Sequence, residues 1–135
     1  MKKLLLFTFI LLVATSCKKY PDGPLFSLSS KKARLCRTWI SDRYFINGVD
    51  KTTPTNPLWT GYKLEFRKNG EVQYYNHPKY NSTAGSWSFD SDKANLSITL
   101  DVLNEYSVIE RLTSSELWLS KNDGTNVVET HFIAE

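Results

Sequence analysis

Cysteine, histidine and glycine are scarce in this chain of 135 residues, with two, two and six copies respectively. A structural zinc site needs about four ligands such as Cys and His, but His77 and His131 stand apart without a ligand residue directly beside either. The sequence also lacks Gly-x-Ser-x-Gly, the phosphate-loop pattern, Gly-x-Gly-x-x-Gly and His-Glu-x-x-His, which mark common enzyme and cofactor sites. We therefore expect no metal, no cofactor and no enzymatic activity.

Long hydrophobic runs are also rare, and the one that stands out is at the N-terminus. Lys2 and Lys3 precede an apolar run over residues 4–13, and the small residues 14–16 (ATS) follow it, which is the layout of a signal peptide. The run is about half of the roughly 20 residues that a transmembrane helix needs. We therefore expect residues 1–16 to be an export signal that is cleaved.

The residue that follows this signal is Cys17, and residues 14–17 (ATSC) resemble the lipobox of bacterial lipoproteins. In that family the cysteine becomes the acylated first residue, and two or more acyl chains give stable membrane anchoring. Ala14 replaces the leucine that is commoner at its position, and the alternative is ordinary cleavage that leaves Cys17 as a plain thiol. The resemblance implies lipid attachment at Cys17 and an outer-membrane lipoprotein of the cell envelope.

Basic residues are not in excess once the signal is removed. Taking Lys2 and Lys3 from the 17 basic residues leaves 15 against 14 acidic ones, a net charge near +1. Nucleic-acid binding depends on neutralising phosphates with Lys and Arg. The charge balance therefore gives no argument for a nucleic-acid partner.

The remaining 119 residues suit one domain with one core. Residues 17–30 contain proline, glycine and several serines but few apolar residues, which predicts a lipidated tether. Residues 31–135 are then the folded domain. Cys36 is interpreted as a small buried apolar residue, and a disulfide between Cys17 and Cys36 requires that Cys17 is not acylated.

From Trp39 onward the sequence alternates between apolar and polar residues, interrupted by turn-forming residues. Ser29 or Ser30 is positioned to cap a short helix over residues 31–36. Residues 106–113 break the alternation, which predicts a β-bulge or a bend there. The pattern predicts eight strands, over residues 39–46, 62–67, 71–75, 86–89, 96–100, 106–113, 117–119 and 127–133.

Eight antiparallel strands in hairpin succession have a physical reason to close. An open sheet would expose two unpaired edges, whereas a closed barrel has none. The interior of an eight-stranded barrel is filled by side chains or holds one small ligand. We therefore predict an all-β fold, an eight-stranded antiparallel up-and-down barrel with a short N-terminal helix.

Several features of the predicted barrel are shared with a known family: residues 35–39, 64–70 (LEFRKNG), 85–87 (GSW) and 109–113, with Leu117, Leu119 and Phe132. In these features the chain resembles the lipocalin-like domains that are common in lipoproteins of Bacteroidetes bacteria. The likeness covers roughly residues 31–133 and is one of rhythm, so it implies the fold and says little about chemistry. Arg37 departs from the wider lipocalin pattern, which has Gly two residues before the first-strand tryptophan, here Trp39.

Aromatic residues gather in the second to fourth predicted strands and the loops beside them. Such rings line hydrophobic pockets, and they fill the interior of a small barrel equally well. The candidate ligand-binding residues are those expected at the barrel rim, namely Trp59, Tyr75, His77 and Tyr80. We expect a small apolar or amphipathic ligand in the barrel mouth, provided that the interior is not wholly filled.

The alternative function is a protein-interaction module. In that case the barrel is solid, and an outer face or the rim binds an envelope protein as an inhibitor or accessory subunit. Trp118 tests this alternative, because it lies out of phase with Leu117 and Leu119 and is expected to point outward. Burial of Trp118 would count against it.

Overall fold

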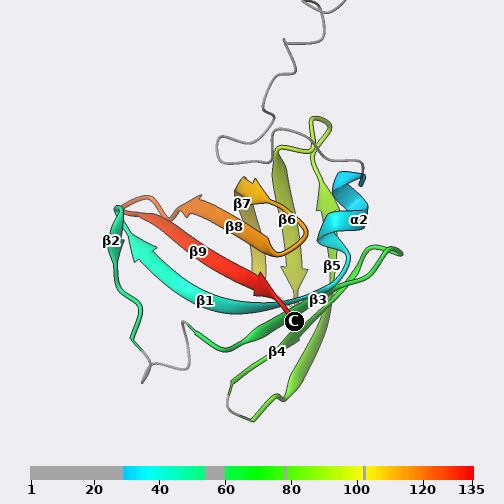
Figure 1. Ribbon diagram of the computed structural model, residues 1–135, viewed down its shortest axis with the longest axis horizontal. Coiled ribbons are helices and arrows are strands. Elements are labelled where there is room, and N and C mark those ends of the chain that lie inside the picture. The colour runs from blue at the N-terminus through cyan, green and yellow to red at the C-terminus, as the bar shows by residue number, and fades with distance from the viewer. Residues whose placement is uncertain (1–28, 54–59, 78, 102) are drawn as a thin grey trace, which may run out of the picture.

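The computed structural model describes residues 29–53, 60–77, 79–101 and 103–135 (Figure 1). The expected signal peptide, Cys17 and Trp59 lie outside the described residues. In the described part the elements are helix α2 (Lys31–Leu35) and the strands β1 (Thr38–Ile46), β2 (Val49–Asp50), β3 (Lys63–Phe66), β4 (Glu71–Tyr75), β5 (Ser82–Phe89), β6 (Asn95–Leu100), β7 (Leu103–Leu112), β8 (Glu116–Asn122) and β9 (Val127–Ala134).

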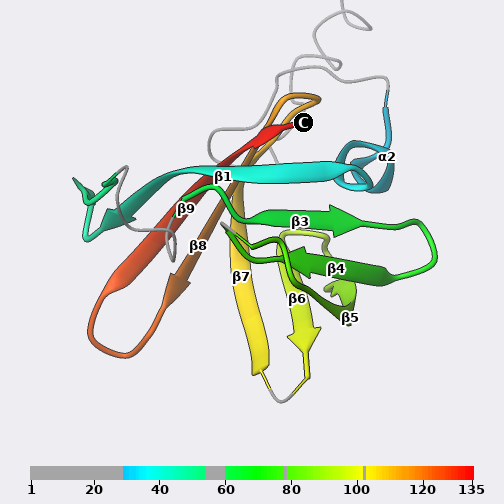
Figure 2. The ribbon, with the colours of Figure 1, turned by 90° about the horizontal axis from the view of Figure 1, so that it is seen from below.

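The strands form one antiparallel sheet that closes on itself. From β3 to β9 each strand pairs with the next one along the chain, and β1 pairs with both β3 and β9. Figures 1 and 2 show the long β1 lying beside β9 on one side and β3 on the other. This closure confirms the predicted all-β, eight-stranded up-and-down barrel with its short N-terminal helix. The short β2 forms a hairpin with the end of β1 and lies outside the closed ring.

All eight predicted strands are present, with three corrections to their length and one addition. β7 begins at Leu103, three residues before the predicted start, because its pairing with β6 continues to that residue. β5 begins at Ser82, four residues before the predicted start. Residues 82–85 pair with β4 although they lack the alternation of apolar and polar side chains that marks the other strands. β8 runs on to Asn122, since its pairing with β9 continues through polar residues. β2 was not predicted, and both of its residues are exposed.

Two register shifts change which side chains point into the barrel. The shift between Ile109 and Arg111 in β7 confirms the bulge that the sequence predicts. A second shift lies between Ser41 and Arg43 in β1 and was not predicted. Because a bulge inserts one extra residue, the inward face of β1 moves from Ser41 to Tyr44, and both residues are buried.

Helix α2 covers one end of the barrel. As expected, Ser30 caps the helix, since its hydroxyl accepts a hydrogen bond from the N–H of Ala33 at 3.1 Å. Trp39 is fully buried and donates its indole N–H to the carbonyl of Leu35 at 2.9 Å. Arg37 occupies the position at which the wider lipocalin pattern has a glycine. Its guanidinium lies 5.7 Å from the centre of the Trp39 ring system, so a cation lies close to this tryptophan.

The hydrophobic core fills the barrel half next to α2. Cys36 is a half-buried thiol that packs against this core, and burial raises its pKa. None of the helical residues that the structure describes forms a segment long and apolar enough to span a bilayer. The side chains that fill this half are those of Leu35, Trp39, Phe66, Val72, Trp87, Leu96, Ile109, Leu112 and Leu117.

Candidate ligand-binding cavity

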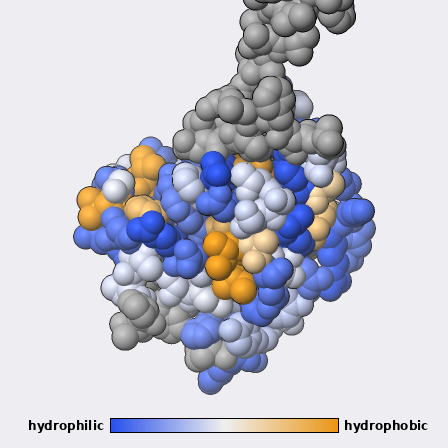
Figure 3. Space-filling view, viewed as in Figure 1, coloured by the Kyte–Doolittle hydropathy of each residue, from blue (hydrophilic) through white to orange (hydrophobic). Residues whose placement is uncertain are grey.

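The barrel half away from α2 is hollow. A cavity of about 730 Å³ lies between the strands and reaches the β6–β7 and β8–β9 turns, where Asp101, Leu103 and Asp123 line it. Apolar side chains are exposed near this end as well: Val49 of β2 and Val127 of β9 are 55% and 48% exposed. Figure 3 shows apolar surface at the side of the molecule where β2 lies. Neither valine lines the cavity, so both belong to the outer surface of the molecule.

The inner part of the cavity is apolar. Its lining includes the buried side chains of Leu64, Ile98, Leu119, Val128 and Phe132, which come from four different strands. These residues point inward because side chains alternate between the two faces of a strand. An apolar ligand that binds here is removed from water, and each square ångström of apolar surface that it buries contributes about 25 cal/mol to the free energy of binding.

Three tyrosines bring hydroxyl groups into this apolar space. Tyr62 packs against Tyr74 with ring centres 5.5 Å apart and against the edge of Phe132 at 5.6 Å. Burial raises the pKa of Tyr62 far above its ordinary value, and the negative charge of Glu105 adds to the effect. Burial also raises the pKa of Tyr44 and of Tyr74. All three hydroxyls therefore stay protonated at neutral pH, and that of Tyr62 is hydrogen-bonded to Thr130.

Charged side chains also point into the cavity. Glu105 of β7 and Lys121 of β8 form an ion pair across neighbouring strands, with Nζ 2.5 Å from Oε1. Both side chains are about one third exposed and both line the cavity. Ion pairs drawn out of bulk water lose hydration and are weak stabilisers of a fold. A charged pair on the inner face of a barrel is therefore a candidate for binding rather than for stability.

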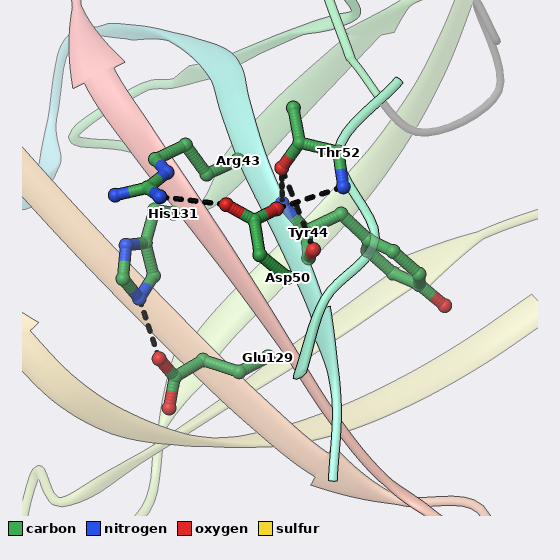
Figure 4. Close-up of polar contacts among 6 residues, drawn as sticks. All are labelled: Arg43, Tyr44, Asp50, Thr52, Glu129 and His131. Atoms are coloured by element: carbon green, nitrogen blue, oxygen red, sulfur yellow. Dashed lines mark hydrogen bonds and ion pairs between the residues drawn. The ribbon is translucent and has the colours of Figure 1, made fainter. Parts of the chain in front are cut away.

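The segment after β2 fixes Tyr44 at the open end (Figure 4). The backbone N–H of Tyr44 donates to the Thr52 hydroxyl at 2.9 Å, and the N–H of Lys51 donates to the Tyr44 carbonyl at 2.8 Å. Asp50 in turn accepts from the N–H of Thr52 at 2.8 Å and pairs with Arg43 at 2.6 Å. In Figure 4 the Tyr44 ring points away from Arg43. The hairpin thus positions a cavity tyrosine.

The rim residues predicted from the sequence lie elsewhere in the structure. Tyr75 and Tyr80 line a smaller surface hollow of about 210 Å³, and His77 contacts the edge of the Tyr80 ring with centroids 5.7 Å apart. The Tyr75 hydroxyl donates to Glu65 at 2.9 Å. The structure thus brings these three residues into one region, apart from the side chains that line the cavity.

Sequence reasoning missed the polar residues of the cavity. Lys121 continues the inward phase of Leu117 and Leu119, and this phase is a signal that could have identified it. Glu105 lies two residues before the buried Ser107 on β7 and is readable in the same way. Tyr44 could not be placed from the sequence, because the unpredicted bulge in β1 decides which face it occupies.

The test residue of the alternative function lies on the outer face of the barrel. Trp118 is half-buried, its ring stacks on His131, and the Arg111 guanidinium lies 5.2 Å from its centre. Arg111 and His131 are its register partners on β7 and β9. Trp118 therefore points outward as expected, but neighbours on both flanking strands already contact its ring.

Within the described residues, no three His, Cys, Asp or Glu side chains gather in the way that a metal site requires. The groups that line the cavity are therefore its apolar wall, the tyrosine hydroxyls and the ion pair of Glu105 with Lys121.

Comparison with known proteins assigns no family: no protein-family model matches the chain, and a search of curated proteins finds no significant match.

Proposed function

We propose that this protein is a membrane-anchored lipoprotein of the cell envelope that binds a small apolar or amphipathic ligand inside its barrel, without catalysis. The observation that supports binding is the cavity of about 730 Å³. Ligand pockets commonly measure about 300–1,000 Å³, with mostly apolar walls and a few polar groups that orient the ligand. The cavity has this size and this lining.

Anchoring is supported by the sequence alone, through the lipobox-like residues before Cys17. It is tested by producing the full chain in a bacterium that processes lipoproteins and measuring incorporation of labelled palmitate. The variant Cys17→Ser should lose the label and leave the membrane fraction. Cys36→Ser removes the other cysteine and should keep both. Equal labelling of the two variants would contradict lipid attachment at Cys17.

Ligand binding is tested with N-phenyl-1-naphthylamine, an uncharged probe whose fluorescence rises in apolar surroundings. Adjacent valines on β9 offer a matched pair of variants: Val128 lines the cavity and is buried, whereas Val127 is 48% exposed and does not line it. Val128→Trp should abolish the fluorescence gain, because the indole occupies ligand space. Val127→Trp adds the same group outside the cavity and should leave binding unchanged.

A variant that fails to fold would also lose binding, so a second blocking variant is needed. Thr83 lines the cavity but its side chain is exposed, and a tryptophan there enters open space instead of packed core. Thr83→Trp should weaken probe binding while the thermal midpoint of unfolding stays close to that of the wild type. Probe binding that survives both Thr83→Trp and Val128→Trp would contradict a ligand site inside the barrel.

A further inference from the structure

The charges that line the cavity are unequal in number. Among the described residues that line it, Asp101, Glu105 and Asp123 carry carboxylates and Lys121 carries the ammonium group. Asp123 accepts hydrogen bonds from the backbone N–H groups of Thr125 and Asn126 at 2.9 and 2.7 Å. These bonds stabilise its charged form. The cavity therefore presents an excess of negative charge at its open end.

The ammonium group of this set is already engaged. Lys121 holds Oε1 of Glu105 at 2.5 Å. An anionic head group would have to take Lys121 from Glu105 and would leave that carboxylate unpaired in a cavity that Asp101 and Asp123 also line. Like charges on the wall of one cavity repel each other and an incoming anion. The charge arrangement thus opposes an anion.

A cationic head group meets the opposite situation. The carboxylate of Glu105 can accept hydrogen bonds from it, and charge-assisted hydrogen bonds are the stronger kind. The rings of Tyr44, Tyr62 and Tyr74 line the same space, and the face of an aromatic ring attracts a cation. Carboxylates and tyrosine faces therefore favour the same sign of charge.

We propose that the ligand of this cavity is a cationic amphiphile, with an ammonium head at Glu105 and an apolar chain on the inner wall formed by Leu64, Ile98 and Phe132. This inference rests on the proposed function, since it names the class of ligand for the same site. Glu105 is the residue that recognises the head group. Lys121 is its internal competitor, because it occupies the same carboxylate.

The experiment compares three ten-carbon probes that differ in head group: decylamine, which is a cation at pH 7, decanol, which is neutral, and decanoate, which is an anion. Each is titrated below its micelle-forming concentration against the full chain loaded with N-phenyl-1-naphthylamine, and displacement is measured. We expect decylamine to compete about tenfold more tightly than decanoate, with decanol between them, because hydrogen bonds to charged groups are stronger than those to neutral groups.

Two variants assign this preference to the ion pair, each with a control of equal charge change. Glu105→Gln should weaken decylamine about tenfold and leave decanol unchanged, whereas Glu71→Gln, at the exposed start of β4, should change neither. Lys121→Met frees Glu105 and should tighten decylamine. Lys68→Met removes an exposed lysine from the turn between β3 and β4, at the opposite end of the barrel, and should have no effect.

The outcomes separate this inference from the function on which it rests. If decanoate competes as well as decylamine or better, the cationic class is wrong and the barrel still binds amphiphiles. If decylamine is preferred but Glu105→Gln leaves it unchanged, the assignment to Glu105 is wrong. If N-phenyl-1-naphthylamine and all three probes fail to bind the folded wild type, the proposed function itself fails.

Discussion

The indole of Trp118 lies face to face with the imidazole of His131, with ring centres 4.0 Å apart and planes only 5° from parallel. The two residues are register partners on β8 and β9. Phe45 of β1 continues the row, with its ring centre 4.7 Å from that of His131. A cross-strand row of rings on the outer face thus joins β8 and β9 to β1, the strand with which the barrel closes.

This contact should be measurable as a coupling energy. Trp118→Ala and His131→Ala should each lower the free energy of unfolding, and the double variant should lose about 0.5–1.5 kcal/mol less than the sum of the two. The measurement is urea unfolding of the four proteins. Tyr106→Ala, which removes a ring that is 58% exposed, should combine additively with Trp118→Ala. Additive losses for Trp118 and His131 would show that the stack contributes nothing.

The buried indole at the closed end should contribute more than the outer stack. Trp39→Phe removes the hydrogen bond to the Leu35 carbonyl and leaves unfilled volume in a fully buried site. We expect a loss of about 1–3 kcal/mol in the free energy of unfolding. The same change at the half-buried Trp118 is the control and should cost less. An equal loss at both positions would contradict the larger contribution of the closed end.

A close approach of two backbones explains the glycine before Trp87. A Cβ atom on Gly85 would lie 2.0 Å from the carbonyl oxygen of Thr99 on the neighbouring β6. Since a backbone atom cannot swing aside, Gly85→Ala should push β5 and β6 apart and lower stability by about 1–3 kcal/mol. Ser86→Ala, at an exposed position on the same strand, should stay within about 0.5 kcal/mol of the wild type. Near-neutral behaviour of Gly85→Ala in urea unfolding would contradict this close approach.

The sequence predicted the strands because most of them alternate apolar and polar residues, a pattern that local chemistry imposes. It could not place the cavity, since the same inward-facing apolar residues are compatible with a filled or a hollow barrel. Phe66 and Leu64 lie two residues apart on one strand, yet Phe66 belongs to the packed end and Leu64 also lines the cavity. The bulge before Tyr44 and the pairing of Glu105 with Lys121 depend on contacts between strands, which a single sequence does not display.

The hairpin that positions Tyr44 should respond to acid through one carboxylate. Hydrogen bonds from the Thr52 hydroxyl and backbone N–H, together with one from Arg43, lower the pKa of Asp50 from 3.8 to about 2. A carboxylate whose pKa is lower in the folded state contributes stability above its unfolded pKa and loses it as the pH falls through the folded value. The contribution of Asp50 is therefore complete above about pH 4 and lost towards about pH 2.

The backbone amide of Thr52 is the local probe of this titration, because its N–H donates directly to Asp50 at 2.8 Å. Its NMR chemical shift should follow pH with a midpoint near 2. Asp50→Asn should abolish that titration, since the amide side chain does not ionise. Asp42→Asn removes a nearby exposed carboxylate from β1 and should leave the midpoint in place. A wild-type midpoint close to the ordinary value of 3.8 would show that Asp50 does not keep its hydrogen bonds to Thr52 and Arg43 in solution.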